Sequence, residues 1–448
     1  MSISLISASR IKDFCNDDPN LWRCLVKSRI HHKKFLDGNV LNVVVKKDGL
    51  VCLTIKFDEV IENEEIKEFS TKYFDNEIFT LISIDKIVGM VFHDLIEKDR
   101  KHKEKISKEK ELEFAIADLL KDYRKGEIAP ITDMDVARWA DQFNYKSDED
   151  RYTFLNEIFR VFKSYYFSEE KQRVIFKKFI DNRIKISRTK FNDPKKGILS
   201  IGFLDANQKY GNSQKYALKI LDEILMEELG VSTKDCKGNN QFFYIDDCLF
   251  SGVRLQNELK DIQKNAIICE NAMIQIWYPF YHVRGYYEIK EKKMDLNYKY
   301  IFSEEQSVLL DNRIENDSPM EMYFPVENDY SDDISTFRKK ITSKNYNRIH
   351  RYKNFPRNEL VFSSKAAREL TENLLLDAGS RILNQNSLHQ KLRPLGFDHK
   401  NGWGFGSLFI SFRNISNNTP IAFWFDGSKY DWFPLFKRKN SIKNKVWS

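Results

Sequence analysis

The stretch Gln241–Leu255 limits what this chain can fold into more than any other. It begins with the apolar and aromatic run Phe242–Ile245, which ends abruptly at Asp246 and Asp247. Such runs, bounded by polar and turn residues, are typical of strands buried on both faces of a parallel sheet. Two adjacent carboxylates at the end of a buried strand are costly unless a ligand or metal compensates them. We therefore expect a ligand here, at the carboxyl end of the strand.

The residues after the acidic pair predict a phosphate site. Ser251 and Gly252 form a turn, and a helical pattern begins at Val253. Free backbone N–H groups and the helix dipole favour an anion at the start of a helix. Carboxylates that can bind a diol, followed by a phosphate site, describe a pocket for a 5-phosphorylated ribose.

Acidic residues that follow a strand also occur in phosphorelay receivers, in metal sites of nucleotide hydrolases and as simple helix caps. A receiver needs a further aspartate after a later strand, whereas the next candidate, Asn271–Tyr278, ends in Trp-Tyr-Pro. The pair could also be the remnant of a ribose-phosphate site that has lost its ligand. These alternatives stay open at the level of the sequence.

Gln241–Leu255 resembles the phosphoribosyl-diphosphate (PRPP) motif of type I phosphoribosyltransferases. The resemblance implies that Asp246 and Asp247 are catalytic residues that bind the ribose hydroxyls and contact Mg²⁺ indirectly, through the ligand. The phosphate contacts that it implies are Phe250, Ser251, Gly252, Val253 and Arg254. Arg254 stands where the family usually has threonine. This departure leaves ordinary transfer chemistry in question.

A repeating strand–helix pattern surrounds this motif. We expect strands at Ile198–Leu204, Phe242–Ile245 and Ala272–Tyr278, with helices at Gln214–Leu229 and Val253–Gln263 between them. This order is the βαβαβ unit of a parallel sheet, so the loop at 205–213 falls at the same sheet edge as the acidic pair. In phosphoribosyltransferases the corresponding loop binds pyrophosphate. The resemblance therefore implies that Lys209, Gly211 and Ser213 bind the ligand.

The C-terminal third carries a second resemblance. Its motifs are Leu392–Phe397, Gly402–Ser407, Asn417–Pro420 and Trp432–Arg438. Together with the acidic pair and a helix at Trp139–Phe143, they resemble phosphoribosyltransferase-like proteins of bacterial anti-phage conflict systems, some of them retron-associated. The resemblance spans about Thr132–Arg438 and implies protein partners encoded in the same defence operon. We expect strands at Leu408–Phe412 and Ile421–Phe425 to form a hood over the sheet. Arg393, Arg413, Lys437 and Arg438 would face a phosphorylated ligand or RNA.

The remaining patterns divide the chain into four parts. Residues 1–96 predict a small α+β module of unknown role, with a hairpin around Asp48-Gly49. Residues 97–125 predict a charged helical linker. Residues 126–190 predict a helical subdomain, and 191–448 an α/β domain with the C-terminal hood. The predicted fold class is α/β, with a parallel-sheet phosphoribosyltransferase-like domain.

Composition sets the outer limits. A net charge of +7 permits contact with nucleic acid but does not require it. Six cysteines without a C-x-x-C pair, behind an N-terminus that lacks a signal peptide, predict reduced thiols in a cytoplasmic protein. No apolar run approaches the roughly 20 residues that span a bilayer, so we expect no membrane partner.

Two functional hypotheses follow. The first is a phosphoribosyltransferase-like effector or accessory protein of a defence system, which binds PRPP or a nucleotide with Mg²⁺ and acts on its ribosyl bond by glycosyl transfer or N-glycosidic cleavage. The second is a non-catalytic nucleotide sensor, or a nucleic-acid-binding subunit of a larger defence complex. Arg254 favours the second.

Overall fold

The computed structural model describes residues 29–32, 36–45, 51–61, 64–70, 79–83 and 86–439, apart from 206–212, 239, 266, 292–293, 315–317, 329, 342–349, 354, 387–390, 399–401 and 427–430 within the last range. The chain forms two compact units, Met1–Lys108 and Glu109–Ser448. The first boundary predicted from the sequence was at residue 96.

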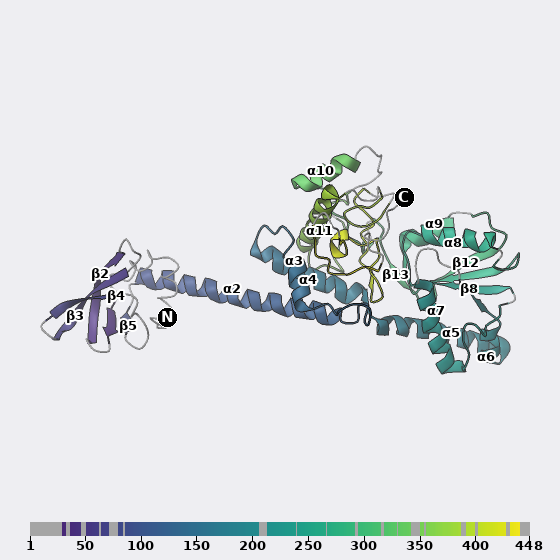
Figure 1. Cartoon of the computed structure of the whole chain (residues 1–448), viewed down its shortest axis with the longest axis horizontal. Helices are drawn as coiled ribbons and strands as arrows, with labels where there is room; N and C mark the ends of the chain where they lie inside the picture. The colour runs from purple at the N-terminus through teal and green to yellow at the C-terminus, as the bar shows by residue number, and fades with distance from the viewer. Residues whose placement is uncertain are drawn as a thin grey trace. The chain divides into compact units, whose positions relative to one another are not determined.

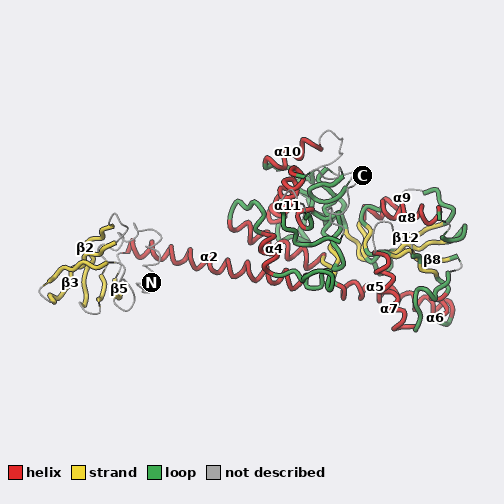
Figure 2. The backbone as a smooth tube through the Cα atoms, viewed as in Figure 1, coloured by secondary structure: helices red, strands yellow, loops and turns green. Residues whose placement is uncertain are grey.

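The first unit contains a five-stranded antiparallel sheet (Figure 2). Its strands are β1 (Arg29–His32), β2 (Leu36–Val45), β3 (Val51–Ile61), β4 (Glu64–Ser70) and β5 (Phe79–Ser83), in the order β4-β3-β2-β1-β5. The expected pairing of β2 with β3 is confirmed, although the Asp48-Gly49 turn lies outside the described residues. Val40, Leu53 and Ile55 are buried.

Helix α2 (Lys86–Leu119) is continuous through the stretch predicted to be a linker. Arg100 pairs with Glu97 and Glu104 on its exposed surface. Ion pairs three and four residues apart support such a solvated helix by a few tenths of a kcal/mol each, about 0.2–0.5. Among the side chains that the structure describes on this helix, the buried apolar ones are Ile116 and Ala117, near its end.

Three helices follow, and each begins with a side-chain cap. They are α3 (Asp133–Ala140), α4 (Asp148–Tyr165) and α5 (Glu169–Phe191). Thr132 and Asp135 form the capping box expected from the sequence, in which each side chain accepts a backbone N–H of the other residue. The predicted apolar face of α3 is confirmed, because Val136, Trp139 and Ala140 are buried.

The second unit is built on a parallel sheet, which confirms the predicted α/β class. Its strands are β7 (Gly202–Phe203), β8 (Gln241–Ile245), β10 (Met273–Trp277) and β12 (Lys299–Ser303), in the order β12-β10-β8-β7. One face packs on α5, α6 (Pro194–Leu199) and α7 (Ser213–Leu229), the other on α8 (Val253–Lys264) and α9 (Val283–Glu291) (Figure 1). Phe243 and Ile245 enter the first core and Tyr244 the second, as strand alternation requires.

Three strands of this sheet resume after a short break as a second parallel sheet. Its strands are β9 (Cys248–Leu249), β11 (Phe280–His282) and β13 (Val308–Leu310), in the order β13-β11-β9. The sequence did not predict this continuation. It matters because Asp246 and Asp247 form the break between β8 and β9 and are therefore held at both ends by strands.

Two strand predictions are wrong. Ile198–Leu204 begins as helix α6, because Pro194 occupies the first position of that helix and the Asp193 side chain accepts from the N–H groups of Lys195 and Lys196. Only Gly202 and Phe203 pair as a strand. Ile421–Phe425 begins with a 3₁₀ turn, η3 (Ile421–Phe423), after Pro420.

The C-terminal segment contributes to a core instead of forming a strand-built hood. Its only strand among the described residues is β14 (Ile410–Ser411), which pairs with β6 (Tyr166–Phe167). Large side chains of this segment share one core with α3, α4 and α11 (Lys365–Gln385); examples are Trp403, Phe409, Phe423 and Trp424. Residues from the predicted parts 126–190 and 191–448 thus occupy the same core. Helix α10 (Asp332–Ile341) packs on α11.

A buried ion cluster ties α11 to the preceding loops. Glu372 accepts from Arg368 Nε at 2.8 Å and from Arg351 Nη2 at 3.0 Å, and all three side chains are fully buried. The Phe324 backbone N–H also donates to Glu372 Oε1. Two guanidinium groups thus depend on one carboxylate.

Among the described residues no helix is both long enough and apolar enough to cross a membrane. Cys236 and Cys248 are buried free thiols, and Cys269 is an exposed one.

Candidate functional site

The acidic pair forms a tight corner between β8 and β9. The Asp247 backbone N–H donates to Asp246 Oδ1 at 2.9 Å, and the Cys248 N–H donates to Asp247 Oδ1 at 2.8 Å. Each carboxylate therefore caps the backbone of the next residue. One oxygen of each side chain is left to face other groups.

Asp246 is the electrostatically strained member of the pair. It is 2% exposed, and its burial, followed by the nearby Asp247 charge, raises its pKa from 3.8 to about 7. The nearest cation is Arg254, whose Nη2 lies 3.6 Å from Asp246 Oδ2, too far for a direct hydrogen bond. Half of the Asp246 side chains would thus carry a proton near neutral pH.

Helix α8 supplies the partners of Arg254. Its Nε donates to Glu258 Oε1 at 2.8 Å, across one helical turn. The other Glu258 oxygen accepts from the Tyr244 hydroxyl on β8. Glu258 is itself buried, so this network keeps a second carboxylate beside Asp246 and adds to the rise in the Asp246 pKa.

The C-terminal segment reaches Asp247. Arg413 Nη2 donates to Asp247 Oδ2 at 2.5 Å, which joins residues 166 positions apart. The guanidinium also lies 5.7 Å from the ring centroid of Tyr216 on α7, while its Nε is buried without a hydrogen-bond partner among the described residues. Arg413 thus bridges α7 and the acidic corner.

Gly252 gives the loop before α8 its shape. Its φ of +77° lies in the left-handed region that favours glycine, and it caps α8 without a side-chain hydrogen bond. A Cβ on Gly285 of α9 would lie 2.1 Å from the Phe250 carbonyl oxygen, so α9 holds this loop by direct backbone contact. The first N–H groups of α8 have no side-chain cap, as a phosphate site requires.

The residues predicted for the site have different fates. Ser213 begins α7 and lies close enough to Asp246 to lower its pKa, although its buried hydroxyl makes no well-formed hydrogen bond among the described residues. Lys209 and Gly211 lie outside the described residues. The Phe250 ring stacks on His282 with centroids 5.2 Å apart, so only its backbone faces the loop.

His282 has a structural role. Burial lowers its pKa to about 4, so the ring is neutral. Its Nδ1 can only donate to the Leu249 carbonyl, 3.1 Å away, which leaves Nε2 to accept from the Ser407 hydroxyl. This assignment fits the Phe409 N–H that donates to the same hydroxyl. His282 therefore joins β9 to the C-terminal segment.

Of the four C-terminal cations expected at the site, Arg413 alone contacts the acidic pair in the part of the chain that the structure describes. Arg438 Nε donates to the Ile415 carbonyl, and its guanidinium lies 5.0 Å from the Trp424 ring centroid. Arg393 is buried and donates to the Leu392 carbonyl. The Lys437 carbonyl accepts from Tyr123 and Arg124.

The described residues hold no group of three or more His, Cys, Asp and Glu side chains that could bind a metal by itself. Magnesium commonly uses one or two carboxylates, several waters and the phosphates of a substrate. The free oxygens of Asp246 and Asp247 fit that indirect role and not a metal cage.

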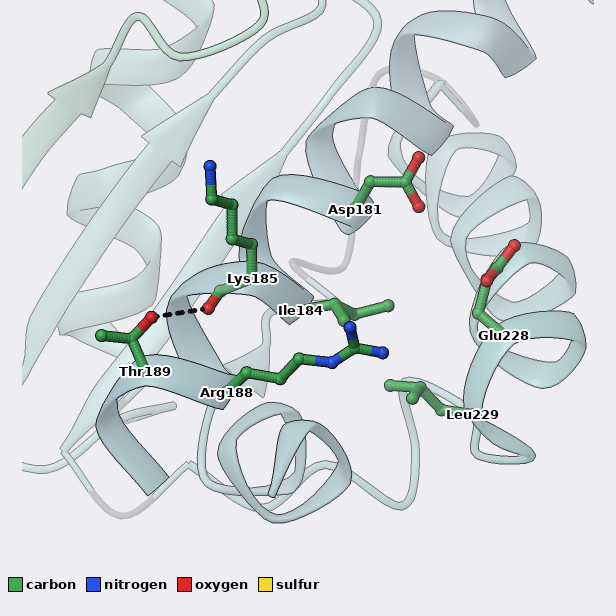
Figure 3. Close-up of a pocket in the computed structure, with 7 residues that line it drawn as sticks. All are labelled: Asp181, Ile184, Lys185, Arg188, Thr189, Glu228 and Leu229. Carbon is green, nitrogen blue, oxygen red and sulfur yellow. Dashed lines mark hydrogen bonds between the residues drawn. The ribbon is translucent and has the colours of Figure 1, made fainter. Parts of the chain in front are cut away.

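The two largest cavities lie away from the acidic corner. One, of about 370 Å³, lies between α5 and α7 (Figure 3). The other, of about 210 Å³, is lined by Phe203 and Asp205 at the end of β7 and by Lys215 and Lys219 of α7, among others. The second borders the start of the loop for which the resemblance implies pyrophosphate binding.

Sequence reasoning missed Glu258 and Tyr244. Arg254 and Glu258 are four residues apart on a predicted helix, which is a readable local signal. Tyr244 is the penultimate residue of β8 and faces α8, but its hydrogen bond depends on how the helix packs.

Comparisons with known proteins agree with this architecture at the level of the family. Residues 136–438, more than half of the chain, match the PRTase-CE family, a phosphoribosyltransferase-like domain. Neither the curated proteins nor the solved structures contain a match. The chain therefore belongs to the PRTase-CE family.

Proposed function

We propose that this chain is a phosphoribosyltransferase-like effector or accessory protein of a bacterial anti-phage defence system, of the kind sometimes associated with retrons. It acts in the cytoplasm with protein partners from the same operon. It binds PRPP or a nucleotide at Asp246-Asp247 and Ser251-Gly252. Mg²⁺ accompanies the ligand.

The observation that carries the proposal is the mismatch at the acidic corner. Asp246 is buried with a pKa of about 7 and, among the described residues, receives no direct hydrogen bond from a cation. An uncapped helix start lies four residues beyond Asp247, at Ser251-Gly252. A ribose diol supplies hydroxyl donors to both carboxylates, and a 5-phosphate accepts from the N–H groups of α8. One ligand thus satisfies both halves of the motif.

The chemistry needs charge stabilisation more than a nucleophilic side chain. In a transfer reaction, the bond from the anomeric carbon to pyrophosphate breaks and its electron pair leaves with pyrophosphate. The acceptor nitrogen then forms the new bond and releases its proton. Asp246 and Asp247 face the positive charge that develops on the ribosyl ring. Mg²⁺ bound with the ligand neutralises pyrophosphate charge.

The two arginines favour a second candidate, a nucleotide sensor without turnover. Arg413 pairs with Asp247, and Arg254 stands beside Asp246. A ligand has to displace or share these contacts, which couples its binding to α8 and to the C-terminal segment. Such coupling suits a protein that reports on a ligand to its partners.

Product analysis separates the two candidates. The protein is incubated with PRPP or nucleotides and Mg²⁺, and pyrophosphate and free bases are measured by chromatography, with Asp247→Asn as the matched variant. Release that depends on Asp247 identifies an enzyme. Binding without release identifies a sensor, and neither binding nor release contradicts the proposal.

A further inference from the structure

Helix α5 has two differently charged halves. In its first part the cations are neutralised: Arg173 pairs with Glu223 and Glu227, and Lys177 pairs with Glu228. Arg183 likewise pairs with Glu305. These pairs bind α5 to α7 and to the loop after β12.

The last turns of α5 and the start of α6 lack such pairs. Residues 185–196 contain five basic side chains and one acidic one, a net charge of +4 in a chain of +7. We call the five basic residues the α5–α6 basic surface: Lys185, Arg188, Lys190, Lys195 and Lys196. All five are exposed, and none forms an ion pair with a described residue. The one acidic residue, Asp193, uses its carboxylate to cap α6.

An exposed aromatic ring lies within this surface. Phe191, the last residue of α5, is 48% exposed. One ring edge lies against α6, where a Cβ on Gly197 would sit 3.0 Å from Phe191 Cδ2. The rest of the ring faces solvent among cations on both sides in sequence. An apolar ring left exposed there has no role in the core.

The larger cavity opens beside the same residues. It is lined by Ile184, Lys185, Arg188 and Thr189 of α5 together with Asp181, Glu228 and Leu229. In Figure 3 the Arg188 side chain extends across the cavity toward Leu229, and Lys185 points away from the other lining side chains. Ile184 and Leu229 give it an apolar part next to a guanidinium.

We propose that the α5–α6 basic surface binds a single-stranded nucleic acid. The unpaired cations contact consecutive phosphates, and an unstacked base lies on Phe191. Charge complementarity selects a polyanion, and the exposed ring selects one with free bases over a duplex, whose bases are stacked inside. The surface lies on the opposite face of the parallel sheet from α8, so this binding is independent of the proposed PRPP site.

The test measures binding of a fluorescently labelled oligouridylate of about 15 nucleotides by polarisation at several salt concentrations. Arg188→Gln/Lys196→Gln should reduce the slope of log affinity against log salt by about 1.4, since each single-strand phosphate contact contributes about 0.7. Phe191→Leu, which keeps the packing on Gly197, should weaken binding about 5- to 150-fold without changing that slope.

Lys260→Gln/Lys264→Gln on α8 is the matched control, because it removes the same charge from two exposed lysines elsewhere. It should leave both affinity and slope unchanged. Asp246→Asn/Asp247→Asn should also bind the oligonucleotide normally. The proposal is overturned by absent binding at low salt, by an equal effect of the control pair, by tighter binding to a duplex of the same sequence, or by a preference for anionic lipid vesicles.

Discussion

Replacing Asp246 by Asn should stabilise the protein at pH 8. The folded state holds a proton on Asp246 up to about pH 7, whereas the unfolded chain releases it near 3.8. The folded state therefore binds more protons, and the free energy of unfolding falls as pH rises through this window. The deficit is complete above pH 7. Just over three pKa units, at about 1.36 kcal/mol each, amount to about 4 kcal/mol, as an upper limit.

The assay is the urea-unfolding midpoint of wild type and Asp246→Asn at intervals from pH 5 to pH 8. The variant should gain most at pH 8, and its advantage should shrink as the pH is lowered toward 4. A gain of this sign is expected where a residue is kept for binding at the expense of stability. A lower midpoint at pH 8, or a difference that does not vary with pH, would refute the reasoning.

Asp398→Asn provides the matched control. Asp398 is equally buried, but it accepts from Arg284 Nη1 at 2.8 Å and from Nη2 at 3.2 Å. The variant loses a well-formed ion pair and should be less stable at pH 8, by about 1–3 kcal/mol. Opposite signs for the two variants would show that the unmet carboxylate, and not burial alone, is responsible.

Two further changes test the packing. Gly285→Ala should lower stability by about 1–3 kcal/mol and weaken ligand binding, because the added methyl group forces the Phe250 carbonyl away from α9; an unchanged melting temperature would exclude that contact. Glu372→Gln should cost about 3–5 kcal/mol in urea unfolding, because two buried guanidinium groups lose their carboxylate. Glu369→Gln on the same helix should have little effect, and equal losses for the two would argue against the ion cluster.

The sequence predicts well what depends on neighbours along the chain. The capping box of Thr132, the strand β8 and the helix α8 are each encoded within a few residues. The parallel sheet follows from the alternation of such elements. These features were sufficient to place Asp246 and Asp247 at the carboxyl end of a buried strand.

What the sequence did not predict depends on contacts between distant segments. No local signal pairs Arg413 with Asp247 or Ser407 with His282, because these contacts exist only once the C-terminal segment has packed. The same packing explains why Ile421–Phe423 is a 3₁₀ turn: its apolar side chains fill a core with Trp139 and need no strand partner. Aromatic, β-rich composition alone could not distinguish these outcomes.

The most direct measurement is the melting temperature with and without PRPP and Mg²⁺, for wild type and for Asp246→Asn/Asp247→Asn. A ligand at about 100 times its dissociation constant adds about 2.7 kcal/mol to the folded state, which is readily seen as a shift. We predict a shift in wild type that is absent in the double variant, although the variant itself remains folded. No shift with PRPP or any common nucleotide, or an equal shift in both proteins, would contradict the assignment of the ligand site to the acidic corner.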